Sequence, residues 1–318
     1  MVILTKNSFM LNTLKTIFVI VLLALTSCNN KNASTQETKI EINNNSKEII
    51  KEPEPITKQF KDYWYNSEAE ITSYKLEQAR YGEIREGSAI LVFVTEPFLS
   101  DEQVKADRNN SSNISVLKLN ATKEFKTGVY PYSIMQSIFY PVANNQHALK
   151  ISCSIQEWCG HVYTQLNNRD EFEITSHSYF ENEADENFNL SKSILENELW
   201  TQLRINPKSL PTGNIQIVPS FEFLRLRHVP LKSYNANAVL NETDYTVSYP
   251  DLDRSITINF KAQFPYEIES WEEKFISGFG DKAKKMSTKA TRVKTIKSDY
   301  WNKNSNNDSF LRQTLGLN

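Results

Sequence analysis

The clearest regularity in the chain is the alternation of apolar and polar residues after residue 57. In RSITINFKAQF (residues 254–264) every second residue from Ile256 to Phe264 is apolar, and HALKISCSI (residues 147–155) repeats the pattern. Residues two apart in a strand lie on the same face, so each segment predicts a strand with one buried face. AILVFV (residues 89–94) is apolar throughout and predicts a central strand that is buried on both faces.

Turn-forming residues separate these segments at the spacing of β-hairpins. Examples are Glu86-Gly87, NNRD (residues 167–170) and PDLD (residues 250–253). Successive strands joined in this way predict an antiparallel sheet.

One segment, SKSILENELWTQLRINP (residues 191–207), predicts a helix instead. Ser193 and Glu196 have the spacing of a capping box, and Pro207 would end the helix. Between them Leu195, Leu199 and Leu203 recur every four residues, which is typical of an amphipathic helix. The predicted fold is therefore mainly β with one amphipathic helix, in which a strongly curved, half-barrel-like antiparallel sheet wraps around the helix.

The first 28 residues have the features of a secretory signal. Lys6 and Lys15 precede the apolar run IFVIVLLAL (residues 17–25), which is too short for a transmembrane span. The run ends in Leu25-Thr26-Ser27-Cys28, which resembles the bacterial lipobox. Residues 1–27 are accordingly predicted to be a lipoprotein signal peptide, and Cys28 is predicted to be the lipidated residue.

Composition divides the remainder into a tether and a domain. The segment after Cys28, residues 29–56, has no aromatic residue and no glycine, so residues 28–56 predict a lipidated cysteine with a disordered tether. Residues 57–318 contain nearly all the aromatic residues and predict a β-rich envelope domain, either undivided or in two subdomains.

Charge and motifs exclude several classes of protein. The formal net charge is −2, and removing residues 1–27 with their two lysines makes it about −4, which gives no indication of nucleic-acid binding. None of the eight glycines forms a GxGxxG, GxxxxGK or GxSxG motif, and no two of the four histidines have the spacing of a helical zinc pair. We therefore expect no cofactor and a non-enzymatic protein.

The stretch QEWCGHVY (residues 156–163) concentrates reactive residue types. Apolar residues occupy odd positions up to Ile155 and even positions from Trp158, so the buried face changes phase near residues 156–157. A β-bulge would produce this change. It would place Glu157, Cys159 and His161 together on the polar face.

The following strand, FEITSHSYF (residues 172–180), is expected to pair with this stretch. Matching buried faces place Cys159 opposite either His177 or Tyr179, and in the second case His161 faces His177. Three interpretations remain open: a zinc or copper site on Cys159, His161 and His177, a Cys–His nucleophile with Glu157 nearby, and a hydrated polar sheet face without chemistry.

The two thiols of the domain, Cys153 and Cys159, are expected to be free. Six residues of extended strand would separate their Cα atoms by about 20 Å, whereas a disulfide needs about 4.4–6.8 Å. Alternation places Cys153 on the buried face and Cys159 on the exposed face.

Several stretches together resemble a family of flavobacterial lipoproteins that is often labelled "septum formation inhibitor Maf". The likeness extends from about Phe60 to Ser305 and is carried by KDYWYNSEAEITSYKLEQARYGEIREGSAILVFVTEPF, FKTGVYPYSIMQSIFYP, IQEWCGHVYTQL, SHSYFE and LPTG. Maf nucleotide pyrophosphatases carry a Ser-x-Ser-x-Arg-Arg loop, and this chain contains no Arg-Arg pair. The label therefore transfers no catalytic residue and is interpreted as a naming error.

These features predict a lipoprotein of the cell envelope, anchored through Cys28 in the outer membrane and facing the periplasm. Its curved sheet would bind a lipid, a glycan or an envelope protein without catalysis. The alternatives are a periplasmic metal- or thiol-dependent enzyme that uses Cys159, His161 and His177, and a Maf-type pyrophosphatase or septum inhibitor.

Overall fold

The computed structural model describes residues 56–318, apart from residues 109, 144, 145 and 318. The predicted signal peptide, Cys28 and the tether up to residue 55 lie outside this part of the chain. No helix within the described residues is long and apolar enough to cross a membrane.

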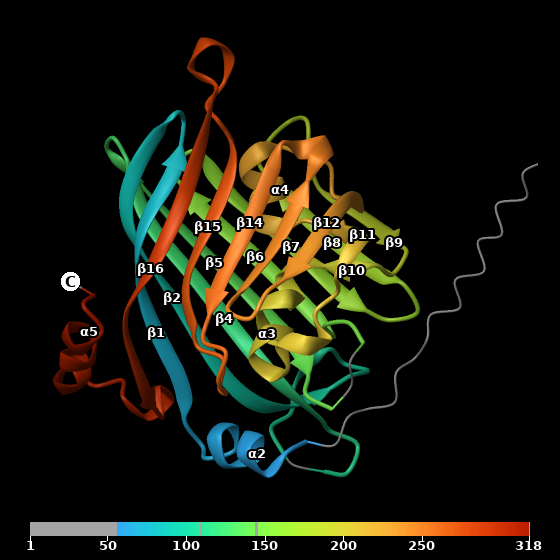
Figure 1. Cartoon of the computed structure of the whole chain (residues 1–318), viewed down its shortest axis with the longest axis vertical. Helices are drawn as coiled ribbons and strands as arrows, with labels where there is room; N and C mark the ends of the chain where they lie inside the picture. The colour runs from blue at the N-terminus through green and yellow to red at the C-terminus, as the bar shows by residue number, and fades with distance from the viewer. Residues whose placement is uncertain (1–55, 109, 144–145, 318) are drawn as a thin grey trace, which may run out of the picture. The chain divides into compact units, whose positions relative to one another are not determined.

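Sixteen strands of the described chain join in a single sheet, as the alternating pattern predicted (Figure 1). Neighbouring strands pair antiparallel, except for the parallel pair β10–β11. The strands are β1 (Ala69–Arg80), β2 (Glu83–Leu99), β3 (Val104–Lys105), β4 (Ile114–Thr127), β5 (Tyr130–Pro141), β6 (Lys150–Glu157), β7 (Gly160–Asn168), β8 (Phe172–Ser178), β9 (Glu186–Leu190), β10 (Ile194–Leu195), β11 (Gly213–Val218), β12 (Tyr234–Leu240), β13 (Asp244–Tyr249), β14 (Arg254–Phe260), β15 (Ile268–Ser277) and β16 (Lys284–Ser298).

The sheet is curved but not closed. Its spatial order begins at β10 and ends at β9, and β1 lies between β16 and β2 in the middle. The two edge strands follow each other in the chain, because only residues 191–193 separate β9 from β10. This short link holds the two edges close together although they form no ladder in the described structure, so an open seam remains between them.

The prediction of a single helix is wrong, because the described residues contain four α-helices. They are α2 (Lys58–Trp64), α3 (Glu196–Ile205), α4 (Phe221–Arg227) and α5 (Phe310–Thr314). The expected amphipathic helix corresponds to α3, but it begins at Glu196 and not near Ser193, because Ile194 and Leu195 pair with β11 as strand β10. Its N-terminus is capped by the Glu198 carboxylate, which accepts a hydrogen bond from the Leu195 backbone N–H.

Helix α3 is buried on its polar side as well as on its apolar side. Leu199 and Leu203 are buried as predicted, and Trp200 packs edge-on against Trp271 of β15 at 5.3 Å between ring centroids. The side chain of Arg204 is also buried and donates two hydrogen bonds, of 2.6 and 2.7 Å, to Glu70 of β1. Helix α3 therefore lies against the inner face of the sheet, and charged groups of the strands satisfy its charged residues.

The alternation predicted for individual strands is confirmed. In β14 Ile256, Ile258 and Phe260 are buried, and the residues between them are partly exposed. The strand ends at Phe260, four residues earlier than its pattern predicted. In β2 the outer face is covered as well, because Leu315 and Leu317 of the C-terminal segment pack with Ile90 and Val92.

Two local predictions are wrong. Gly87 is not in a turn but inside β2, where an added Cβ would lie 2.1 Å from the Glu124 carbonyl oxygen of β4. No β-bulge occurs near residues 156–157, since the chain reverses there in a tight hairpin with Trp158 and Cys159 as its loop. A hairpin changes the phase of the buried face just as a bulge would, and the pattern could not distinguish the two.

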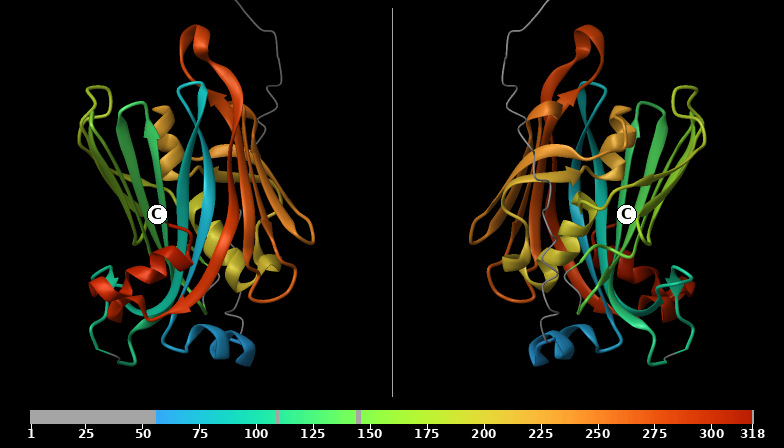
Figure 2. Two further views of the ribbon diagram at one scale, coloured as in Figure 1. Left: turned by 90° about the vertical axis from the view of Figure 1, so that its left-hand side faces the viewer. Right: turned by 90° about the vertical axis from the view of Figure 1, so that its right-hand side faces the viewer.

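The hairpin turns at one end of the sheet bear on the functional argument below. They are the β1–β2, β4–β5, β6–β7, β8–β9, β13–β14 and β15–β16 turns, and we refer to this end as the turn end. Helix α2 lies at the opposite end, as Figure 2 shows by the separation between the blue helix and the dark orange β15–β16 turn.

Candidate functional site

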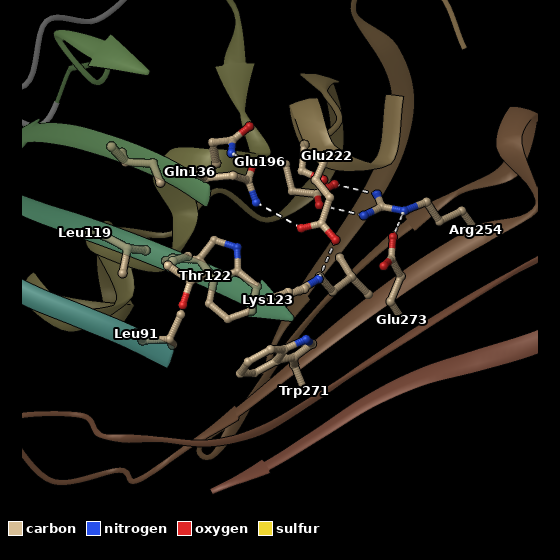
Figure 3. Close-up of a pocket in the computed structure, with 16 residues that line it drawn as sticks. Leu91, Leu119, Thr122, Lys123, Gln136, Glu196, Glu222, Arg254, Trp271 and Glu273 are labelled. Carbon is tan, nitrogen blue, oxygen red and sulfur yellow. Dashed lines mark hydrogen bonds and ion pairs between the residues drawn. The ribbon is translucent and has the colours of Figure 1, made fainter. Parts of the chain in front are cut away.

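A cluster of charged side chains lies between the sheet and helices α3 and α4 (Figure 3). At its centre Arg254 of β14 donates a 2.6 Å hydrogen bond from Nη2 to Glu196 of α3 and another of 2.6 Å from Nε to Glu273 of β15. Tyr249 donates its hydroxyl to Glu196 as well, at 2.5 Å. Burial by itself would lower the pKa of the Arg254 guanidinium. The carboxylates of Glu196 and Glu273 together have the larger effect, so the pKa is raised.

The second half of the cluster is centred on Glu222 of α4. Lys123 of β4 contacts its Oε1 at 2.8 Å, and Gln136 of β5 donates to its Oε2 at 3.1 Å. Asn197 of α3 then donates to Gln136 at 2.7 Å, which links the two helices through the sheet. Burial raises the pKa of Glu222, since Lys123 compensates the desolvation of the carboxylate only in part.

The space beside these groups is small. The cavity bounded by the cluster, Trp200 and Trp271 has a volume of about 50 Å³. This is enough for a few water molecules but far below the roughly 300–1,000 Å³ of typical ligand sites. Since its carboxylates and cations are paired with one another, the cluster serves to fix α3 and α4 on the sheet.

This packing changes where a ligand could bind. The concave side of the sheet was the predicted binding surface, but α3 packs on β4 and β5 there, and α4 packs on β6. A ligand would have to displace these helices. The predicted lipid- or glycan-binding face is therefore covered by the protein itself over the region of the helices.

A larger cleft lies where strands β7, β8 and β9 face α4. It has a volume of about 390 Å³, and we call it the seam cleft because β9 is one edge of the open seam. One part of its wall is apolar, and the lining residues of this kind are Phe188, Phe221, Leu224, Val229, Pro230 and Leu231. The polar lining residues are Thr164, Ser176, Asn182, Glu183, Glu186, Arg225 and His228.

Charged groups gather at the mouth of the seam cleft, near the turn end. The Glu183 carboxylate lies 2.6 Å from Nδ1 of His228 and 3.3 Å from Arg225. His228 ends α4 with a φ of 53°, and the Arg225 guanidinium stacks over the Phe180 ring at 4.2 Å. This site could not be predicted from the sequence because its residues are far apart in the chain, and the alternation of β8 does not indicate that α4 faces it.

The structure does not bring the sequence-predicted site residues together as expected. Register β7–β8 places His177 opposite Tyr163, so it lies opposite neither Cys159 nor His161. His177 instead contacts Asp185 at 3.3 Å, and His161 is exposed opposite Gln156. No group of three or more His, Cys, Asp or Glu residues in the described part of the chain is arranged to hold a metal ion.

The thiols lie where the alternation placed them. Cys153 is buried, Cys159 is exposed, and both are free. The reason given above was wrong, however, because the chain turns back between them at the β6–β7 hairpin. Glu157 accepts a hydrogen bond from the Cys159 backbone N–H at 2.7 Å, and its carboxylate raises the pKa of the thiol, which disfavours a thiolate nucleophile.

Comparison with known proteins gives no family. No protein-family model matches the chain, and no curated protein matches it. Among solved structures, a beta-barrel-like protein of a domain of unknown function (DUF1849) from Brucella abortus aligns with 8% identity and a TM-score of 0.44, over 72% of this chain and 98% of its own. A porin-like protein from Bacteroides uniformis aligns with 9% identity and a TM-score of 0.20, over 70% and 95%.

Proposed function

We propose that this protein is a lipid-anchored protein of the cell envelope that holds a single-chain amphiphile, without catalysis, in the seam cleft. The observation that carries the proposal is the combination of an apolar wall with a charged mouth in a cleft of about 390 Å³. That volume falls in the range of about 300–1,000 Å³ that small-ligand sites occupy.

The lining of the seam cleft supports the choice of ligand. An acyl chain would lie against the apolar side chains between Phe221 and Leu231, and a polar head group would meet Arg225 and His228 at the mouth. Since Val229, Pro230 and Leu231 form an apolar run in the lining, beside Phe221 and Leu224, an acyl chain fits the cleft better than a glycan or an envelope protein, the other two ligands that the sequence left open.

The anchor is proposed from the sequence. Leu25-Thr26-Ser27-Cys28 supports acylation of Cys28, and Asn29 with the acid-free run up to Glu37 supports a place in the outer membrane facing the periplasm. Cells fed labelled palmitate are expected to label the wild-type chain and to leave a Cys28→Ser variant unlabelled. Equal labelling of both chains would contradict the lipid anchor but would leave the proposal of ligand binding in the seam cleft unaffected.

Filling the seam cleft tests the binding function. Val229 lines the cleft and is partly buried, so Val229→Trp should occupy the space of the ligand. We expect the affinity for a fluorescent fatty acid to fall at least about tenfold, which corresponds to about 1.4 kcal/mol. Val239→Trp is the matched control, because Val239 is exposed on β12, outside the cleft.

Native mass spectrometry of the wild-type chain provides a second readout. It should show a co-purified amphiphile that is depleted in Val229→Trp and retained in Val239→Trp. Equal affinities and equal ligand content in the two variants would remove the seam cleft as the binding site.

A further inference from the structure

Apolar side chains project from separate turns at the turn end of the sheet. Val129 in the β4–β5 turn is 77% exposed, Trp158 in the β6–β7 turn 69%, Tyr179 after β8 73%, and Phe279 in the β15–β16 turn 55%. Isolated exposed apolar residues need no explanation, but four such residues on neighbouring turns of one end do.

These residues stand beside other aromatic and cationic groups of the turn end. Trp158 lies 6.1 Å from the Tyr130 ring, and Tyr179 lies against Gly160 at the base of the same β6–β7 turn. On the other side of the turn end, the Arg227 guanidinium of α4 lies 5.4 Å from the Phe279 ring. We call the set of Val129, Trp158, Tyr179 and Phe279 the turn-end rim.

Two arginines beside the rim contact no carboxylate within the described part of the chain. Arg80 is buried and donates to the Leu226 carbonyl and to the hydroxyls of Tyr81 and Tyr132, all neutral groups. Within the described chain, the Arg227 guanidinium lies over the aromatic rings of Phe275 and Phe279. Burial and the charge of Arg80 lower the pKa of Arg227, so the two cations repel each other.

We propose that the turn-end rim docks on the surface of a phospholipid bilayer that contains anionic lipid. Trp and Tyr rings favour the interfacial layer of a bilayer, because their bodies are apolar and their tips form hydrogen bonds. Arg227, which is partly exposed beside Phe279, would place its positive charge next to anionic head groups. This surface is separate from ligand binding in the seam cleft, although the cleft opens at the same end.

The shape of the rim favours a bilayer over a protein partner. Its four side chains stand on separate hairpin turns, so they form individual projections and not one continuous patch. Projections of this kind enter a deformable layer one by one, whereas a protein partner needs a matched cavity for each.

Depth-dependent quenching of tryptophan tests the docking with the full chain. The protein is reconstituted in vesicles of zwitterionic and anionic phospholipid, with bromine on the acyl chains close to the head groups. Trp158 and Trp301 are the strongly exposed tryptophans of the described chain, and Trp301 lies near α5, away from the rim. We expect quenching in the wild type, its loss in Trp158→Phe, and its retention in Trp301→Phe.

Two results would overturn the docking surface. One is absence of quenching in the wild-type chain, and the other is loss of quenching in Trp301→Phe with retention in Trp158→Phe. Arg227→Gln adds a test of charge, since it should lower the quenching in anionic vesicles and leave it unchanged in purely zwitterionic ones. An equal effect in both vesicles would refute the role of the arginines.

Discussion

Replacing Arg254 with methionine tests whether the buried charge cluster holds α3 and α4 on the sheet. Methionine keeps most of the side-chain length but removes the cation. In the wild type Arg254 is fully enclosed and contacts Glu196 and Glu273. The variant would leave two buried carboxylates without their positive partner.

The expected cost follows from the depth of the cluster. Removing one member of a buried ion pair destabilises a protein by about 3–5 kcal/mol, a large part of a typical total of about 5–15 kcal/mol. Arg292→Met is the matched control, because Arg292 also contacts two carboxylates, those of Glu267 and Glu269, but is 25% exposed. An exposed network of this kind should contribute no more than about 1 kcal/mol.

Urea unfolding of both variants measures the difference, and hydrogen exchange locates it. Backbone amides of α3 should exchange faster in Arg254→Met and at the wild-type rate in Arg292→Met. Adding Glu196→Gln to Arg254→Met should restore about 1–3 kcal/mol of the unfolding free energy, since the second substitution removes one of the two unpaired charges. Equal unfolding free energies for Arg254→Met and Arg292→Met would refute the structural role of the cluster.

Two further predictions concern ionisation. Burial raises the pKa of Tyr74, Tyr140, Tyr245 and Tyr249, so their stabilising effect is complete below the ordinary tyrosine pKa and is lost as the pH rises above it. At about pH 11 the loss of unfolding free energy is about 1.4 kcal/mol for each tyrosine, or about 6 kcal/mol for the four together. Tyrosinate absorbance and loss of circular dichroism should therefore appear in one cooperative step. Gradual ionisation of these tyrosines with the fold intact would contradict their burial. Cys159 should react with iodoacetamide under native conditions, whereas Cys153, whose pKa is raised by burial, should react only after unfolding. Peptide mapping that finds Cys153 modified first would contradict the placement of Cys153 in the interior and Cys159 on the surface.

Much of the sheet could be predicted because alternation is a local signal. The faces of β2, β6 and β14 follow directly from residue spacing in AILVFV, HALKISCSI and RSITINF. The β6–β7 hairpin could not be distinguished from a bulge, since both change the phase of the buried face by one residue. The predicted cluster of Cys159, His161 and His177 depended on that choice and on a register that the structure does not show.

The interior could not be predicted for a different reason. Glu196, Glu198 and Arg204 are of residue types that are ordinarily exposed, and only the strands that enclose α3 turn them into buried residues with partners. The partners come from positions up to 134 residues away, as in the Arg204–Glu70 pair. Such pairs leave no periodic signal in the sequence.

The state of the charges distinguishes the interior cluster from the turn end in this domain. In the interior, Arg254 and Lys123 each meet carboxylates at 2.8 Å or closer, and the remaining space holds only a few waters. At the turn end, Arg80 and Arg227 meet neutral groups and aromatic rings, while Trp158 and Phe279 are exposed. Arg227 is partly exposed there, and anionic head groups would interact favourably with its charge. The same surface would then orient the mouth of the seam cleft toward the membrane from which a single-chain amphiphile could enter.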